Sequence, residues 1–237
     1  MKVLVIPDVH LKPHMFDQAN KILKEGIAEK AVCLMDLPDD WDQQYNIALY
    51  EETYDKAIAF AKKHPDSLWC YGNHDLSYLW GLIETGYSSL ATSTVVRKLV
   101  KLNRTLPENN PIQYVQRIDN VLFCHGGITE SFVEENVSLE YQNDVDRVIE
   151  TINEMGSEQM WDDNSPIWYR PQYAHVPMFM EKDFLQVVGH TPLRGIDKYY
   201  NVISCDVFST YQDGRPIGSQ EFLLLDTKTW EYKGITV

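Results

Sequence analysis

The sequence predicts a layered α/β protein whose chemical groups gather at one edge of its sheets. Apolar runs of four residues, which are typical of buried strands, occur five times, and each leads into a polar motif. These runs are residues 3–6, 31–34, 68–71, 121–124 and 185–188. Segments with helical spacing follow the first runs, and strand-like runs fill the last third of the chain. Because ligands of such proteins bind beyond the carboxyl ends of strands, we expect the five motifs to meet.

The first half of the chain is expected to alternate strands with helices. Residues 15–25, after the first strand, have apolar side chains on one helical face, among them Phe16 and Ile22. A longer helix is predicted over residues 43–62 and another over residues 89–102. The longer helix carries a largely aromatic stripe at helical spacing, which we interpret as core: Ile47, Tyr50, Tyr54, Ile58 and Ala61.

The middle of the chain is predicted to hold a hairpin and a helix. Residues 112–115 and 120–124 have the apolar content of two strands, and the second strand enters His125. Helical spacing continues over residues 138–155 and stops before Gly156, a residue that commonly ends helices.

The last third is predicted to be mostly strands. Residues 201–206, 221–226 and 230–235 are expected to close a second sheet. The candidate insertion is residues 157–183, which are rich in Met, Trp, Tyr and Pro and are expected to be irregular. We expect residues 1–237 to form a single domain around one large core.

Composition points to a protein of a reducing compartment. The chain has no run of 18 apolar residues, so no membrane span and no membrane partner are expected. Its first eight residues are too short for a signal peptide and run directly into a polar motif. The cysteines stand in apolar runs, which predicts buried thiols and a cytoplasmic location. They are Cys33, Cys70, Cys124 and Cys205.

The net charge of −14 bears on partners. Long nucleic acid is an unlikely partner, because diffuse binding to phosphates needs clustered Lys and Arg. Small phosphorylated substrates and phosphoproteins stay possible, since divalent ions would dominate the local field. The sequence does not indicate an oligomeric state.

The polar motifs supply ligands for two divalent ions. Carboxylate, imidazole and amide ligands suit Mn, Fe or Zn, and the lack of thiolates argues against a closed structural zinc site. The candidate ligands are Asp8, His10, Asp36, Asn73, His125 and His190. His74 and Asp75 follow Asn73 directly, a place that suits a group touching substrate. Gly126 and Gly127 are expected to let backbone pass close to metal or phosphate. One bridging carboxylate can hold two ions roughly 3.5–4 Å apart, the spacing of two-metal phosphate chemistry.

The motifs, taken in order, resemble those of the calcineurin-like metallophosphoesterases. They are Asp-x-His at 8–10, Asp-x-x-Asp at 36–39, Gly-Asn-His-Asp at 72–75, His-Gly-Gly at 125–127 and Gly-His-Thr at 189–191. The pattern is most similar to the branch of phosphoprotein phosphatases and bacterial diadenosine tetraphosphatases. The resemblance implies a four-layer α/β/β/α sandwich with two mixed sheets. It also implies two metal ions, with Mn expected and Fe, Zn or Ni as alternatives.

The resemblance implies a role for each residue of the motifs. Asp8 and His10 would bind the first metal ion, and Asp36 would bridge both ions. His74 would be the general acid that protonates the leaving oxygen, and Asp39 would hold its imidazole in the productive orientation. A metal-activated water would be the nucleophile. The remaining ligands of the second ion would be Asn73, His125 and His190.

Three departures from the family pattern affect specificity. Met35 stands where the family usually has Gly, and Asp40 with Trp41 replaces an Arg-Gly pair. The missing Arg removes a bidentate phosphate clamp. Pro192 stands where many phosphodiesterases and nucleases of the superfamily have a second His. The last departure favours a phosphatase.

The candidate insertion offers a replacement cation. Residues 165–170 resemble the stretch of the diadenosine tetraphosphatase branch that carries a Trp and a phosphate-binding Arg. We hypothesise that Arg170 replaces the missing clamp and binds substrate together with Asn73, while Trp168 or Tyr169 lines the pocket. The alternative is a surface Arg beside packing aromatics.

These features predict a dinuclear metal-dependent phosphoesterase. The expected activity is a phosphatase acting on phosphomonoesters of proteins or small molecules, or on nucleoside polyphosphates. One alternative is a phosphodiesterase or nuclease on the same metal core. An alternative of another class is a non-catalytic metal-binding interaction protein.

Overall fold

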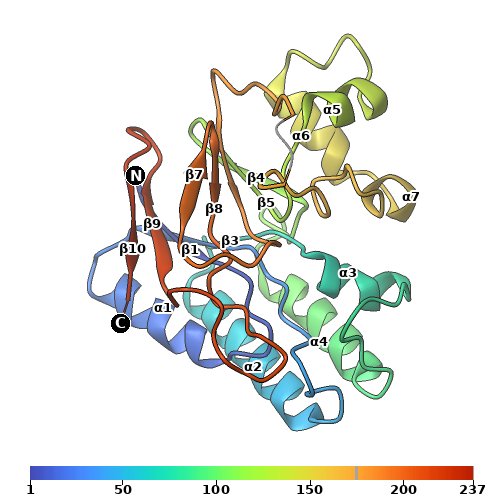
Figure 1. The fold of residues 1–237 in the computed structure, drawn as a ribbon, viewed down its shortest axis with the longest axis vertical. Helices are drawn as coiled ribbons and strands as arrows, with labels where there is room; N and C mark the ends of the chain where they lie inside the picture. The colour runs from blue at the N-terminus through green and yellow to red at the C-terminus, as the bar shows by residue number, and fades with distance from the viewer. Residues whose placement is uncertain (174–175, 237) are drawn as a thin grey trace.

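The computed structural model describes residues 1–173 and 176–236, and these residues form four layers (Figure 1). Two five-stranded sheets pack face to face, and helices cover the outer face of each. Both sheets contain parallel and antiparallel pairs. The predicted α/β/β/α sandwich is therefore confirmed. No helix in the described ranges is long and apolar enough to cross a membrane.

The first sheet has the strand order β10-β9-β1-β2-β3. Strands β1 (Lys2–Ile6), β2 (Lys30–Cys33) and β3 (Leu68–Trp69) are parallel, whereas β9 (Phe222–Asp226) and β10 (Tyr232–Ile235) add antiparallel pairs. Our assignment of the last two strands to the second sheet is wrong. A strand buried on both faces carries no sequence mark of its neighbour, and β9 pairs with the first strand of the chain.

The second sheet has the order β4-β5-β6-β8-β7. Strands β4 (Val115–Ile118) and β5 (Val121–Cys124) form the predicted hairpin, and β6 (Leu185–Val188) and β8 (Val202–Ser204) continue the sheet in parallel. The first hairpin strand begins later than predicted. The edge strand β7 (Asp197–Tyr199) is exposed and polar, so its sequence gives no strand signal.

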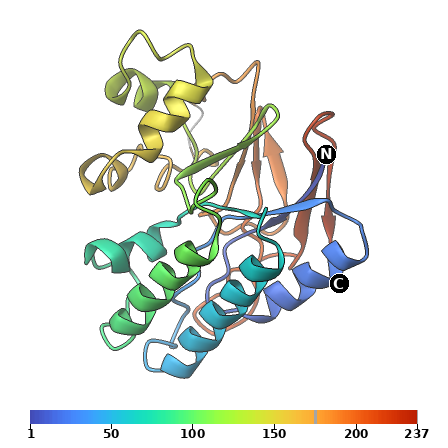
Figure 2. The ribbon, with the colours of Figure 1, turned by 180° about the vertical axis from the view of Figure 1, so that it is seen from behind.

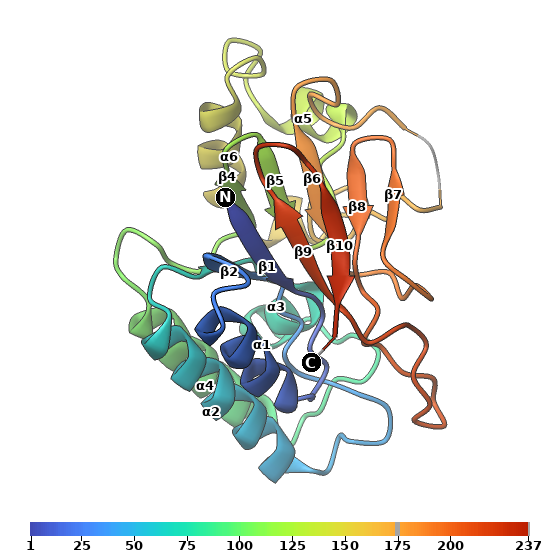
Figure 3. The same ribbon diagram turned by 90° about the vertical axis from the view of Figure 1, so that its left-hand side faces the viewer.

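One helical layer covers the first sheet (Figure 3). Helices α1 (His14–Lys24), α2 (Ile47–Lys63) and α4 (Thr92–Thr105) pack against it. The structure confirms these predicted helices with shifted ends, because residues 43–46 form turns instead of the first turn of α2. Helix α3 (Asn73–Trp80) follows β3 directly and starts at a motif residue, and it was not predicted.

The opposite helical layer covers the second sheet (Figure 2). It contains α5 (Glu130–Asn136), α6 (Val145–Asn153) and the short α7 (Ser157–Met160). The predicted helix over 138–155 begins only at α6, because Asp144 caps it by accepting hydrogen bonds from two backbone N–H groups. Beyond α7 the segment 157–183 has no further helix in its described part, and residues 174–175 lie outside the described residues.

The core consists of one cluster between the sheets and one under each helical layer. Side chains such as Val5, Phe123 and Val187 fill the space between the sheets. All four cysteines are buried free thiols. The buried side chains between the sheets hold the two sheets together. The loops described next follow the carboxyl ends of β1, β2, β3, β5 and β6.

Candidate metal centre and active site

Six side chains from five strand ends converge at one place. Asp8 and His10 follow β1, Asp36 follows β2, and Asn73 begins α3 after β3. The last two, His125 and His190, follow β5 and β6. The structure therefore confirms that the side chains of the five motifs lie close together. All six are buried except His10, which is half-buried.

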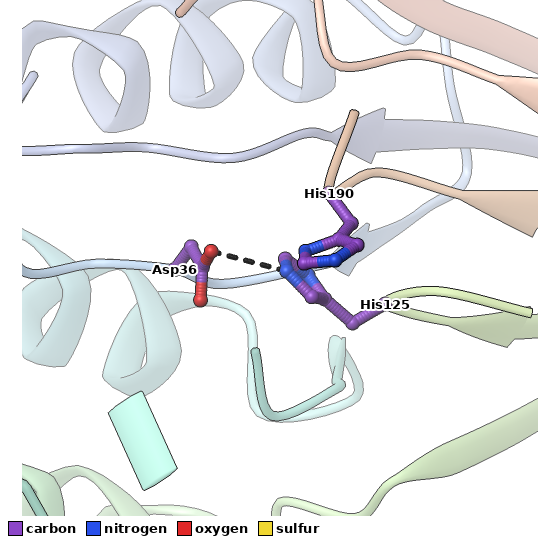
Figure 4. Close-up of side chains that lie close together, drawn as sticks. All are labelled: Asp36, His125 and His190. Carbon is purple, nitrogen blue, oxygen red and sulfur yellow. Dashed lines mark ion pairs between the residues drawn. The ribbon is translucent and has the colours of Figure 1, made fainter. Parts of the chain in front are cut away.

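Two groups of potential ligands share one carboxylate. Asp8, His10 and Asp36 form the first group, and Asp36, His125 and His190 form the second. Within each group the ligand atoms all lie within 4.8 Å of one another. Figure 4 shows the side chains of the second group pointing toward one another. The arrangement suits two cations joined through Asp36.

Backbone carbonyls orient two of the imidazoles. Nδ1 of His10 donates to the carbonyl oxygen of Asp39 at 2.9 Å, and Nδ1 of His125 donates to that of Leu34 at 3.1 Å. With a proton on Nδ1, each ring offers the lone pair of Nε2 to the site. Nε2 of His125 lies 3.0 Å from Oδ2 of Asp36 and 3.1 Å from Oδ1 of Asn73. The amide oxygen of Asn73 therefore belongs to the second group.

The carboxylates are held by backbone N–H groups beside glycines. The His74 N–H donates to Oδ1 of Asp36, and the His190 N–H donates to Oδ2 of Asp8, both at 2.9 Å. A Cβ atom on Gly72 would collide with Asp36, and one on Gly189 would collide with Asp8. These two glycines therefore make room for the carboxylates at the strand ends.

Unpaired buried atoms show that the residues fit a cation. Oδ1 of Asp8 and Nε2 of His190 are buried and have no hydrogen-bond partner among the described residues. A buried polar atom without a partner is costly, and a divalent ion would satisfy both atoms. Burial, together with the Asp206 carboxylate, raises the pKa of Asp8 well above its usual value. Burial also lowers the pKa of His190 well below its usual value, so this imidazole is neutral and free to bind metal.

His74 and Asp39 form a pair beside the two ligand groups. Nδ1 of His74 lies 3.0 Å from Oδ2 of Asp39. Burial acts to lower the pKa of His74, but the carboxylates of Asp36 and Asp39 outweigh it and raise that pKa to about 9. The imidazole is therefore a proton donor at neutral pH, and its Nε2 is left for a substrate. Asp40 does not contact His74; it pairs with Lys12 at 3.0 Å.

Three buried tyrosines donate hydrogen bonds to the carboxylates of Asp39 and Asp75. The sequence analysis did not predict this role for them. Tyr50 and Tyr78 donate to Oδ1 of Asp39 at 2.8 and 2.6 Å, and Tyr54 donates to Asp75 at 3.3 Å. Tyr50 and Tyr54 lie in the stripe that we interpreted as core only. The available signal was Tyr rather than Phe, because a buried phenol hydroxyl needs a partner.

Asp75 ties two motifs together. Its carboxylate accepts from the Gly72 N–H at 3.2 Å, from the Leu37 N–H at 3.3 Å, and from Tyr54. The group therefore holds the turn into α3 against the loop that follows Asp36. It lies behind the site and does not line the cavity.

A cavity of about 280 Å³ opens over this arrangement. Its wall includes His10, Asp36, Asn73 and His74. The rest of the wall is formed by Asp39, Asp40, Trp41, Thr85, Gly86, Arg170, His190, Pro192, Asp206, Ser209, Thr210 and Ile217. Four of the six candidate ligands and the His74–Asp39 pair are thus accessible to one small substrate.

The comparison with protein families decides the identity. The model of the calcineurin-like phosphoesterase family matches residues 1–214. The chain belongs to this family. Members use divalent metal ions and act on phosphoesters, so this chain is a hydrolase of phosphoesters. No curated protein matches the chain significantly.

Solved structures share the fold of this calcineurin-like phosphoesterase. The cold-active protein-tyrosine phosphatase of a psychrophilic Shewanella species is 18% identical, with a TM-score of 0.60 over 99% of this chain and 80% of that chain. A further cold-active protein tyrosine phosphatase structure is 19% identical, with a TM-score of 0.59 over 99% and 78%. An archaeal phosphodiesterase is 14% identical at a TM-score of 0.45 over 100% of both chains, a likeness too weak to carry an argument.

Arg170 reaches the cavity of this phosphoesterase as the sequence suggested. Its Nη1 donates to the carbonyl oxygen of His190 at 2.9 Å and to the Thr191 hydroxyl at 3.2 Å. Both acceptors are neutral, and within residues 1–173 and 176–236 the guanidinium group forms no ion pair with a carboxylate. The expectation that Trp168 or Tyr169 lines the pocket is wrong. Trp168 packs edge-on against His190 with ring centroids 5.4 Å apart, and Tyr169 is buried, whereas Trp41 lines the cavity.

Gly126, directly after His125, packs against the segment 157–183. The Gly126 N–H donates to the carbonyl oxygen of Pro166 at 2.6 Å, and a Cβ on Gly126 would collide with the backbone of Tyr169. The expectation that Gly126 and Gly127 let backbone pass close to metal or phosphate stays a prediction. They allow the chain that leads to Arg170 to pack against the strand end that carries His125.

Proposed function

We propose that this phosphoesterase is a dinuclear metal-dependent phosphatase. The observation that carries the proposal is the position of Asp36 in both ligand groups, beside a His74–Asp39 pair that faces the same cavity. Asp8 and His10 would hold the first ion and Asn73 would join the second group. Mn²⁺ is the expected ion at both sites, because oxygen and imidazole ligands suit it.

Besides the metal ligands, three residues of the chain have roles in this reaction: Arg170, His74 and Asp39. When bound, the two ions polarise the phosphate and lower the pKa of water, which supplies the nucleophile. Arg170 would bind a phosphate oxygen through its guanidinium group. Nε2 of His74 would give its proton to the leaving oxygen, and Asp39 would keep the ring in that orientation through Nδ1.

Several observations support monoesters as the substrates. Pro192 stands at the cavity wall where many diester-cleaving members have a further metal-binding His. The fold neighbours with TM-scores near 0.6 are named protein-tyrosine phosphatases.

The location is a separate part of the proposal. Four buried free thiols favour a reducing compartment, which supports a cytoplasmic location.

The direct test compares a monoester with a diester. We expect the purified protein with Mn²⁺ to hydrolyse p-nitrophenyl phosphate faster than bis-p-nitrophenyl phosphate, and a chelator to abolish both activities. His74→Asn is expected to lower kcat while metal content is retained, whereas Asp36→Asn is expected to lose metal as well. His14→Asn and Asp17→Asn, both at exposed positions of α1, serve as controls.

Each rival function has its own outcome. A diester preference in the same assay would indicate a phosphodiesterase. Bound metal without turnover of any phosphoester would indicate an interaction protein on this scaffold. Full activity in both His74→Asn and Asp36→Asn would overturn the assignment of the site.

A further inference from the structure

Beyond the candidate ligands, the His74–Asp39 pair, Arg170 and Pro192, the cavity wall comes from three loops. Residues 40–41 lie on the loop after β2, residues 85–86 on the loop after α3, and residues 209–217 on the loop after β8. A phosphate held at Asp36 and Arg170 would place its leaving group, the part protonated by His74, against these loops. Their chemistry therefore determines which leaving groups are accepted.

Trp41 provides a fixed aromatic face in this wall. Its side chain is 44% exposed, although Trp is usually well buried. Nε1 donates to the Thr210 carbonyl oxygen at 2.9 Å, and the Trp41 backbone N–H donates to Oδ1 of Asp40 at 2.9 Å. The polar edge of the indole is thus occupied, and the ring is held before substrate arrives.

Part of the wall that Trp41 lines is uncharged. Thr85, Gly86, Pro192 and Ile217 carry no charge. Gly86 has φ +87, and a Cβ there would stand 3.2 Å from Cβ of Asp39, so this loop passes close over the His74–Asp39 pair. A side chain at this position would therefore press on Asp39, next to the general acid.

Asp40 gives this part of the wall a negative charge. Its Oδ1 accepts from the Thr210 hydroxyl at 2.8 Å, and its Oδ2 accepts from Nζ of Lys12 at 3.0 Å. Burial acts to raise the pKa of Asp40, but Lys12 and these hydrogen bonds outweigh it and lower that pKa. The carboxylate is ionised at neutral pH. Lys12 is not part of the wall, so the cavity meets the carboxylate of Asp40 and not the ammonium group that pairs with it.

We propose that the cavity selects phosphomonoesters whose leaving group is an uncharged aromatic ring, which stacks on Trp41, and that Asp40 disfavours leaving groups carrying further negative charge. The proposal rests on the phosphatase function above and narrows its substrate class. Aryl phosphates, including the phosphotyrosine side chain, fit this description, whereas nucleoside polyphosphates do not. The volume of about 280 Å³ is at the small end for ligand pockets, which span about 300–1,000 Å³, and it suits a small monoester.

The aromatic part is tested with two substrates that both release primary alcohols. Benzyl phosphate and n-butyl phosphate have leaving groups of similar basicity, so their ratio of kcat/KM reports ring recognition. We expect wild-type enzyme to favour benzyl phosphate by about tenfold, and Trp41→Leu to reduce the preference to about twofold. Trp41→Phe should retain most of it. Tyr211→Ala is the control, because Tyr211 is equally exposed at 44% but lies outside the wall.

The charge part uses phenyl phosphate and 4-carboxyphenyl phosphate. We expect wild-type enzyme to disfavour the carboxylated substrate by about tenfold, and Asp40→Asn to reduce this discrimination to about twofold or less. Asp42→Asn removes the same charge from an exposed position on the same loop and should leave the ratio unchanged. Thermal unfolding and metal content, measured for each variant, show that the site is intact.

The outcomes separate the two levels of the proposal. Equal kcat/KM for benzyl and butyl phosphate in wild-type enzyme, or an unchanged ratio in folded, metal-loaded Trp41→Leu, would overturn the inference and leave the phosphatase function standing. Preference for a nucleoside triphosphate over phenyl phosphate would overturn it in the same way. Failure of the metal-loaded wild-type enzyme to hydrolyse any of these esters would instead overturn the phosphatase function itself.

Discussion

The hydroxyl of Tyr78 lies 2.6 Å from Oδ1 of Asp39, on the carboxylate whose other oxygen faces Nδ1 of His74. Tyr78 also accepts from the Ser88 N–H at 2.7 Å, and Tyr50 donates to the same carboxylate oxygen. Asp39 is therefore fixed from behind by two phenols. A carboxylate held in this way can keep the His74 ring in a single orientation.

Replacing Tyr78 with Phe should disturb this orientation without removing the imidazole. We expect kcat to fall by about tenfold with KM nearly unchanged. The loss of one of the two hydroxyl donors to Asp39, together with the unpaired Ser88 N–H, should also lower the free energy of unfolding by about 1–2 kcal/mol. Steady-state kinetics and urea unfolding measure the two effects. Tyr87→Phe is the matched control, since its ring stacks on Tyr78 but its hydroxyl bonds Thr92. Equal kcat losses in both variants would contradict a specific role for Tyr78.

The pKa of His74 predicts the alkaline limit of activity. A general acid must carry its proton, so kcat/KM should fall as the pH rises through the pKa of His74. That pKa is raised from 6.5 to about 9 by Asp36 and Asp39 against the effect of burial. Bound cations at Asp36 offset part of its charge, so we expect an apparent value between these two limits.

Asp39→Asn removes one of the charges that raise this pKa. The alkaline limb of the kcat/KM profile should therefore move to lower pH, and kcat should fall by roughly 10- to 100-fold. The profile is measured at saturating Mn²⁺, so that loss of metal does not imitate the effect. An alkaline limb that stays in place, or moves to higher pH, would argue against His74 as the proton donor.

Arg170 is expected to act on the phosphate. Arg170→Ala should lower kcat/KM for phenyl phosphate by roughly tenfold or more, because a charge-assisted contact in the transition state is lost. Arg170→Lys should recover only part of this loss, since an ammonium group cannot make two parallel bonds. Arg194→Ala, at an exposed position nearby, is the control. Unchanged kcat/KM in Arg170→Ala would show that Arg170 does not bind the phosphate in the transition state.

Metal binding should release protons near neutral pH. Burial acts to lower the pKa of His125, but Asp36 and Asp8 outweigh it and raise that pKa to about 9. Below pH 9 the metal-free site therefore holds a proton on this imidazole that a cation must displace. Calorimetry of Mn²⁺ binding at pH 7 in buffers of different ionisation enthalpy should report release of about one proton per site pair. Affinity should rise with pH up to about 9. Identical apparent enthalpies in all buffers would contradict this reading.

The sequence predicted well that the motif residues meet, because the signal is local. Asp8, Asp36 and His125 each follow a short apolar run, and the parallel arrangement of such runs brings their ends to one edge. The pairing of His74 with Asp39 also followed from motif spacing. Sheet membership depends on partners distant in the chain, so the place of β9 beside β1 could not be read from its residues.

The tyrosines and Trp41 were missed for a similar reason. Tyr50 has the spacing of a core residue and is fully buried, as predicted, but the partner of its hydroxyl is set by how α2 packs against the loop carrying Asp39. Trp41 lines the cavity because the distant Thr210 bonds its indole. Such contacts appear only once the chain has folded.

Met35 gives a sharp test of backbone strain next to the candidate bridging carboxylate. Met35 has φ +57, in the left-handed region that favours glycine, and its side chain is fully buried. Loss of buried volume in Met35→Ala should cost about 2–4 kcal/mol. Met35→Gly loses one more buried carbon, worth about 0.8 kcal/mol, but relieves strain of about 1–2 kcal/mol, so it should be more stable than Met35→Ala. At Met15, equally buried within α1, the order should reverse, because glycine is about 0.5–1 kcal/mol worse than alanine inside a helix. Urea unfolding of the four variants measures both differences. If Met35→Gly is the less stable of its pair, the left-handed conformation at Met35 costs little, and the family's glycine at this position must have another cause.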